Sequence, residues 1–93
     1  MPENTNRTVS RERLVLGRAV RELRARRGLT QETLGFESHL PGEAAEHLHR
    51  NYVGAIERGE VNVTFRILLK LAHGLGVPLS MLIRLYERRL EEP

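Results

Sequence analysis

Arginine is the side chain with the clearest chemical use in this sequence. Fourteen of the fifteen basic residues are Arg, whose planar guanidinium forms paired hydrogen bonds with a phosphate or with the edge of guanine. Their distribution is uneven, because residues 1–27 carry eight Arg and three Glu whereas residues 28–60 carry two Arg and six Glu. Composition alone favours nucleic acid only weakly, since a charged helix face is more often simply solvated.

Histidine is the other residue type that could support chemistry. An enzyme or a metal protein would have to use the four histidines, His39, His47, His49 and His73. His47 and His49 would face different sides of a helix, and no carboxylate or nucleophile lies at a catalytic spacing from them. The chain has no cysteine, which excludes disulfides and thiolate metal sites. We therefore expect no enzymatic activity, no metal, no cofactor and no small-molecule ligand.

The size of the chain suits one small domain. Ninety-three residues with two Phe, two Tyr and no Trp predict a modest core of Leu, Val, Ile and Ala, which fits packed short helices better than a sheet. No run approaches the roughly 18 apolar residues that span a membrane, and the chain does not begin with a hydrophobic signal core. We expect a soluble, cytoplasmic protein with one domain over residues 9–90, a mobile tail over residues 1–8 and a frayed end over residues 91–93.

Two helices are predicted in the first half of the chain. Ser10 can cap a helix that ends at Gly28, with Leu16, Val20 and Leu23 on one stripe and Arg on the other faces. Thr30 can cap the next helix, which ends near residues 38–40 because Pro41 and Gly42 disfavour its continuation. Within it Leu34 points inward and Gly35 suits the close approach of another helix.

Three further helices are predicted in the second half. One ends at Gly59, with Leu48, Val53 and Ile56 inward, and begins either near Glu43 or only at His49. Thr64 caps the next, over residues 64–76, which is expected to bury Phe65, Leu68, Leu69 and Ala72. Pro78 or Ser80 opens the last helix, which ends at Leu90. The fold class is therefore all-α, a bundle of five helices without strands.

The order of three motifs resembles a known family. LRARRGLTQETLG, YVGAIERGEVNVT and LLKLAHGLGVPLSMLI follow one another over residues 23–83 much as in the lambda-repressor-like helix-turn-helix domains of the Xre/Cro type, and the whole resemblance covers about residues 14–83. The resemblance implies double-stranded DNA as partner, a homodimer, and a repressor or activator of transcription at the nucleoid of a prokaryote or of a phage-infected cell. The alternative is an antitoxin-type module that binds a partner toxin and represses its own operon, although the chain has little room for a toxin-wrapping tail.

The sequence departs from the family pattern inside the helix-turn-helix. Without PGEAAEHL, residues 41–48, the sequence would read FESHLHRNYVGAIERG, as in an ordinary family member. We interpret these eight residues as an insertion that either loops outward or lengthens the third helix backwards. The helical extension is favoured because EAAEHL contains good helix formers. It would bring Glu43 and Glu46 close to DNA phosphates.

The start of the third helix carries the residues expected to read DNA. An α-helix fits the major groove, where Arg can form a fork to guanine and Asn a fork to adenine. Aligned from Gly59, this helix begins with His49, Arg50 and Asn51. We expect Arg50 and Asn51 to contact bases and His49 to act as a cap or phosphate contact. The expected interface also includes Tyr52, Gly54 and Ala55.

Other positions are expected to support the reading helix. By resemblance, Gln31 touches the DNA backbone and buttresses the reading helix, Thr30 combines capping with a phosphate contact, and Asn62 is a further phosphate contact. Arg58 could attract DNA or only be solvated. The family pattern also implies an ion pair between Arg24 and Glu57 that ties the first helix to the third.

The last helix is expected to form the dimer. Its apolar residues exceed what one core-facing stripe needs, which suggests a twofold interface at Leu82, Leu85 and Tyr86. The alternative is that they all pack in a monomer core. A symmetric dimer would place two reading helices roughly 34 Å apart and select an inverted repeat.

Overall fold

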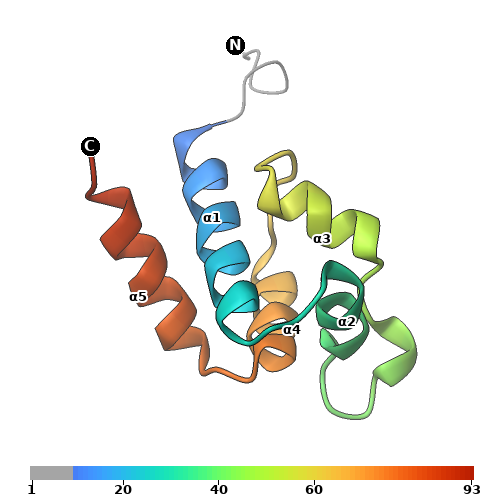
Figure 1. The fold of residues 1–93 in the computed structure, drawn as a ribbon. Helices are drawn as coiled ribbons and strands as arrows, with labels where there is room; N and C mark the ends of the chain where they lie inside the picture. Colours follow the sequence, from blue (N-terminus) through green and yellow to red (C-terminus); the bar gives the residue numbers. More distant parts are fainter. Residues whose placement is uncertain (1–9) are drawn as a thin grey trace.

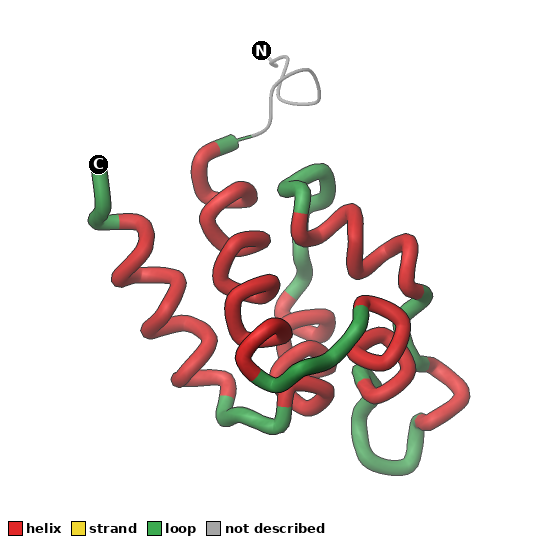
Figure 2. The backbone as a smooth tube through the Cα atoms, in the orientation of Figure 1, coloured by secondary structure: helices red, strands yellow, loops and turns green. Residues whose placement is uncertain are grey.

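The computed structural model describes residues 10–93, and the predicted tail over residues 1–8 lies outside this range. All regular secondary structure in the described part is helical, and the helices are joined by loops without any strand (Figure 2). The all-α prediction with five helices is confirmed. The elements in chain order are α1 (Arg11–Arg26), α2 (Gln31–Glu37), the short 3₁₀-helix η1 (Ala44–Glu46), α3 (Arg50–Glu57), α4 (Phe65–Leu75) and α5 (Leu79–Leu90).

Hydroxyl caps begin three of the helices where the sequence predicts them. The side chain of Ser10 accepts a hydrogen bond from the backbone N–H of Arg13 at 3.2 Å. Thr30 accepts from the N–H of Thr33 at 2.9 Å, and Thr64 caps α4 in the same way. These bonds satisfy backbone donors that the first helical turn leaves free. Of the two residues proposed to open α5, Pro78 is the one that precedes it.

The core lies where α1 meets the other helices (Figure 1). Helix α1 packs against α3 on one side and α5 on the other, and α2 packs against α3 and α4. The fully buried large side chains are Leu34, Ile56, Leu71, Leu75, Leu82, Val20 and Val53. Ala72 is buried as predicted, but Phe65 is 66% exposed. Phe65 is the first residue of α4 and precedes the turns that cross the core.

A glycine that sequence reasoning did not single out sets the distance between α1 and α3. A Cβ atom at Gly17 would lie 2.4 Å from the carbonyl oxygen of Ile56 and 2.5 Å from that of Glu57. Gly35, where the sequence predicts the close approach of a helix, faces instead the carbonyl of Leu48 in the loop before α3. Both glycines let backbone lie where a side chain would otherwise stand.

The preferred interpretation of residues 41–48 is wrong. These residues do not lengthen α3, which begins at Arg50, and they form a loop that contains only η1. Gly42 has a φ of 82°, a left-handed conformation that does not belong to a right-handed helix. The backbone is extended at His47 and His49. Good helix formers alone do not decide the structure here, because contacts with the rest of the domain outweigh propensity.

Two of the three residues predicted for the dimer interface lie in the core of a single chain. Leu82 is fully buried and Leu85 is 4% exposed, so neither side chain is free to contact a second copy. The prediction is wrong for these two leucines, because α5 turns them towards α1. Tyr86 is only half-buried.

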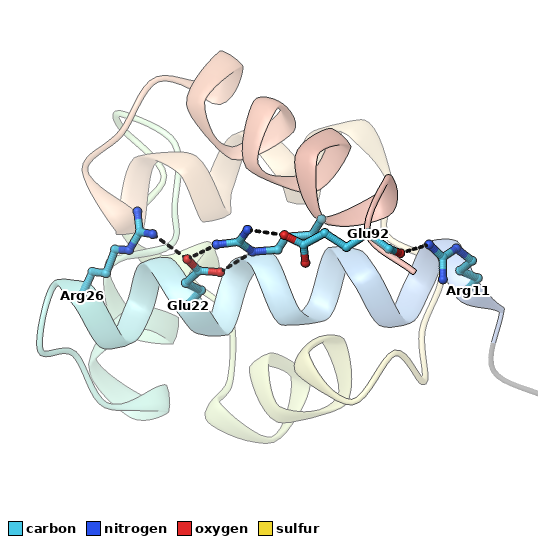
Figure 3. A network of polar contacts seen from close by, with 5 residues as sticks. Arg11, Glu22, Arg26 and Glu92 are labelled. Atoms are coloured by element: carbon cyan, nitrogen blue, oxygen red, sulfur yellow. Dashed lines mark hydrogen bonds and ion pairs between the residues drawn. The ribbon is translucent and has the colours of Figure 1, made fainter.

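Helices α1 and α5 are also joined by charges along their exposed edge (Figure 3). The guanidinium of Arg89 donates to the carboxylate of Glu22 at 2.8 and 3.0 Å and to that of Glu92 at 2.8 Å. Arg11 donates to the backbone carbonyl of Glu92 at 2.9 Å.

Within residues 10–93 no single helix is long and apolar enough to cross a membrane. Helices α4 and α5 meet the length and composition test only when they are taken together, and the pair is bent by 104°.

Candidate nucleic-acid interface

Helix α3 is short, and its first turn is fixed by a histidine. The ring Nδ1 of His49 accepts a hydrogen bond from the backbone N–H of Asn51 at 3.0 Å, which makes His49 the N-cap of α3. The cap role expected for His49 is confirmed. Because the cap satisfies a free N–H of this turn, it orients the residues that follow.

Arg50 and Asn51 stand exposed on that first turn. The Arg50 side chain is 59% exposed, and its Nη1 lies 3.8 Å from Oε1 of Glu32 on α2. An ion pair between two exposed side chains contributes little to stability. Arg50 is therefore held only loosely, and its guanidinium remains available to a ligand in front of α3.

The second turn of α3 brings the start of α2 close to the helix. A Cβ atom at Gly54 would lie 3.1 Å from Nη1 of Arg58 and 3.5 Å from Oε1 of Gln31. Gly54 is buried and Ala55 half-buried. Tyr52 is half-buried against the core. The predicted positions on α3 thus differ in access, with Arg50 and Asn51 the most open.

Glu57 is the buried centre of the contacts that support α3. Its carboxylate accepts from Nε of Arg24 at 2.6 Å, from Nη2 of Arg24 at 3.1 Å and from Nε2 of Gln31 at 3.0 Å. The hydrogen bond to Glu57 raises the pKa of Arg24. Arg24 also donates to the carbonyl of Leu29 at 2.9 Å. One carboxylate therefore joins α1, α2 and α3, as the predicted ion pair and buttress require.

Arg58 and Asn62 lie beyond this centre. Arg58 donates to both carboxylate oxygens of Glu60, at 2.8 and 3.2 Å, and this hydrogen bond lowers the pKa of Glu60. Asn62 is exposed in the connection from α3 to α4. It lines a hollow together with Tyr86 and does not lie beside Arg50. Most of the predicted interface residues thus lie around α3, whereas Asn62 lies apart from them in the connection to α4.

The loop over residues 41–48 is bound to α4 by two cations that sequence reasoning missed. Lys70 is 7% exposed, and its Nζ donates to the carbonyl of Glu46 at 2.8 Å. Arg66 donates to the carboxylate of Glu43 and lies 4.0 Å from that of Glu46. The only available signal was that Lys70 is the single lysine of the chain and lies one turn after Arg66. These contacts place the guanidinium of Arg66 beside both carboxylates predicted to disturb DNA docking.

The same loop forms a hollow beside Arg50. Its volume is about 310 Å³, and its lining residues are Glu32, Phe36, His47, Leu48, His49 and Arg50. Phe36, which the sequence did not single out, is 60% exposed. Its ring lies 5.3 Å from that of His47, measured between centroids. The helical phase set by Leu34 already places Phe36 outward, but the path of the loop could not be predicted.

The histidines do not gather into a metal site in the described part of the chain. His39 and His73 pack against one another with ring centroids 5.2 Å apart, whereas His47 packs on Phe36 and His49 caps α3. Among residues 10–93, no group of three or more His, Asp or Glu side chains could hold a metal ion.

Comparison with known proteins points to one family. A helix-turn-helix family model matches residues 20–82. The control protein C.BamHI of Bacillus amyloliquefaciens is 38% identical over 66 residues, which cover 70% of this chain and 72% of that protein. Residues 20–82, which the family model matches, contain α2, α3 and the contacts that support them.

Solved structures agree with this assignment. The restriction-modification controller protein C.AhdI from Aeromonas hydrophila is 40% identical, with a TM-score of 0.68 and coverage of 78% of this chain and 98% of that one. The controller protein C.Esp1396I gives a TM-score of 0.77 at 24% identity, covering 90% and 97%, and at that identity shows the fold alone. The clp gene regulator ClgR from C. glutamicum gives 0.71 at 25% identity, covering 85% and 92%.

Proposed function

Because the chain belongs to the Xre-type, lambda-repressor-like helix-turn-helix family, we propose that it is a homodimeric transcriptional regulator that binds an inverted-repeat operator in double-stranded DNA, as a repressor or controller. The observation that carries the proposal is the exposed pair Arg50 and Asn51 on the capped first turn of α3. The likeness to restriction-modification controller proteins favours this function over the antitoxin alternative.

Base reading falls to the first turn of α3. The guanidinium of Arg50 forks to O6 and N7 of guanine, and the amide of Asn51 to N6 and N7 of adenine. The open environment of both side chains supports these roles. Ala55 and Tyr52 contribute surface along the same helix. Gly54 has no side chain, which leaves room for the side chains of Gln31 and Arg58 beside the helix.

Contacts with the DNA backbone fix the register of the reading helix. Gln31 and Thr30 lie at the start of α2, next to α3, and reach a phosphate together. Arg58 leaves Glu60 for a phosphate, which costs little because the pair is exposed. Asn62 contacts the backbone from the connection after α3. Such contacts position the protein and carry no direct sequence information.

The dimer forms through a different face of α5 from the one expected. A hollow of about 190 Å³ lies between α1, the α3–α4 connection, α4 and α5, and its apolar lining residues are Leu16, Val61, Val63, Leu68, Ile83 and Tyr86. A second copy that covers this surface would shield these partly buried side chains from water. Tyr86 therefore stays in the proposed interface, whereas Leu82 and Leu85 support it from the core.

Selection of bound duplexes from a random DNA pool, at a stated salt concentration, tests the function. The parent should select an inverted repeat, and Arg50→Ala and Asn51→Ala should each relax the preference at one position of the half-site. Arg18→Ala removes an exposed charge of α1 and serves as the control, with the parent preference retained. If both α3 variants keep the parent preference and differ only in salt-sensitive affinity, α3 does not read bases.

A further inference from the structure

The hollow beside Arg50 has a chemistry of its own. Leu48 is its most buried lining residue at 7% exposure, and the rings of Phe36 and His47, tilted by 54° to one another, form one wall. Single exposed apolar residues are common on protein surfaces and carry no meaning alone. Phe36, however, shares its hollow with Arg50 and with the cap residue His49. The apolar wall is thus continuous with the first turn of the reading helix.

The charges at the rim restrict what can enter. Glu32 lines the hollow next to Arg50, with its side chain 75% exposed. The guanidinium of Arg50 lies 3.8 Å from this carboxylate, so the rim carries no net charge and offers the phosphate backbone no net attraction. An uncharged base edge needs no such attraction. The major groove offers one apolar group on its base edges, the C5-methyl of thymine.

We infer that the hollow walled by Phe36 and His47 receives the C5-methyl group of a thymine in the major groove, next to the base that Arg50 contacts. This inference rests on the proposed DNA-binding function and deepens it. The loop over residues 41–48 is then part of the recognition surface, because it supplies His47 and Leu48 to the hollow. Lys70 and Arg66 hold this loop in place from α4.

Replacing thymine by uracil tests the inference without altering the protein. Deoxyuridine differs from thymidine by the methyl group alone and keeps the same base pairing. Each thymine of the selected half-site is replaced in turn, symmetrically in both halves, and the dissociation constant is measured. Burial of one methyl group predicts that the parent binds about fourfold more weakly when the critical thymine is replaced.

Two phenylalanine variants show whether Phe36 is responsible. Phe36→Ala should bind the thymine and uracil duplexes equally well. Phe65→Ala, which removes the other exposed Phe from outside this hollow, should retain the fourfold difference. Because both side chains are exposed, both variants should fold, and thermal unfolding checks this. His47→Ala removes the second ring and should reduce the difference in the same way.

Several outcomes would overturn the inference and leave the proposed function standing. They are a selected half-site without thymine, a parent indifferent to every uracil substitution, or a Phe36→Ala variant that still prefers thymine. Equal loss of affinity for both duplexes in Phe36→Ala would mean that the ring contacts the backbone. If the parent selects no sequence at all, the proposed function fails, and the methyl subsite fails with it.

Discussion

The carboxylate of Glu57 shows how one buried residue can set the relative orientation of three helices. Its side chain is 4% exposed and accepts hydrogen bonds from Arg24 and Gln31, so α1 and the start of α2 are tied to the last turn of α3. A buried charge without its partners is costly. The three helices therefore share one orientation that none of them fixes alone.

Removing this carboxylate should destabilise the domain. Glu57→Ala leaves the guanidinium of Arg24 partly buried without its partner, and we expect the free energy of unfolding to fall by about 3 kcal/mol. Urea-induced unfolding followed by circular dichroism measures the change. Glu60→Ala removes a carboxylate from an exposed pair and should have little effect. Similar losses in both variants would show that burial of the Glu57 pair is not what matters.

At this scale the sequence predicts the residues whose roles follow from helix phase and capping. Ser10, Thr30 and His49 cap as expected, and the Arg24–Glu57 pair forms. Phe36 and Lys70 could not be predicted as site residues. Their surroundings depend on the path of residues 41–48, which local propensity does not determine.

The loop over residues 41–48 is the element whose structure differs from the one predicted. It is anchored on one side by Leu48, whose backbone N–H donates to the carbonyl of Gly35 at 3.0 Å, and on the other by Lys70. The predicted helical extension is interrupted where the backbone is extended at His47 and His49, and there the carbonyl of Glu46 accepts a hydrogen bond from Lys70. These are contacts between distant parts of the chain, which a local sequence pattern cannot show.

Removal of the lysine anchor should loosen the loop more than the domain. In Lys70→Met the apolar stem still fills its site, and water can reach the carbonyl of the exposed Glu46. We expect the free energy of unfolding to change by less than about 1 kcal/mol, because replacing a buried charge by an apolar group is often neutral. Amide hydrogen exchange at residues 46–48 should accelerate about tenfold, reflecting easier local opening.

The control for this experiment is Arg21→Met, which removes one exposed positive charge on α1. It should leave exchange in the loop unchanged. If exchange at residues 46–48 is equally slow in Lys70→Met and in the parent, the hydrogen bond to Glu46 does not hold the loop.

The contact between α1 and α5 makes the stability of the fold depend on pH. The hydrogen bond from Arg89 is the main cause that lowers the pKa of Glu22 (Figure 3). A carboxyl group whose pKa is lower in the folded state stabilises the fold above its unfolded pKa, near 4.5. This stabilisation is lost as the pH falls through the lower folded value.

Unfolding free energies measured from pH 7 to pH 3 should therefore fall below about pH 4.5 in the parent. Arg89→Met removes the main cause of the lowered pKa, so the variant should lose part of this acid dependence. Arg88→Met, an exposed neighbour on α5, should keep the full slope. Parallel curves for the parent and Arg89→Met would show that the Glu22 carboxyl does not contribute to it.

For the whole molecule, the five-helix architecture was predictable because glycines, caps and apolar stripes all mark the same boundaries. The residues of the proposed dimer interface were harder to predict. An excess of apolar residues on α5 was visible, but Leu82 and Leu85 proved to be core residues. The periodicity of apolar residues shows that a side chain is shielded from water. It does not show whether the shielding comes from the same chain or from a second copy.

The two remaining exposed faces of α5 allow a direct test of the proposed dimer. Ile83 lines the apolar hollow with Tyr86, whereas Met81 is 47% exposed and lies on the side of Arg84 and Arg88. Ile83→Glu places a charge in the proposed interface, and a buried unpaired charge opposes association strongly. We expect this variant to remain monomeric at concentrations where the parent is a dimer, and Met81→Glu to dimerise as the parent does.

Sedimentation velocity over a range of protein concentrations measures the association. DNA binding then links it to function, since a monomer makes the contacts of one half-site only and should lose the advantage of the inverted repeat over a single half-site. Circular dichroism must show that the Ile83→Glu domain still folds, because Ile83 is half-buried. If Met81→Glu abolishes the dimer and Ile83→Glu does not, the second copy binds the opposite face of α5, and the two reading helices of the dimer would be spaced differently on DNA.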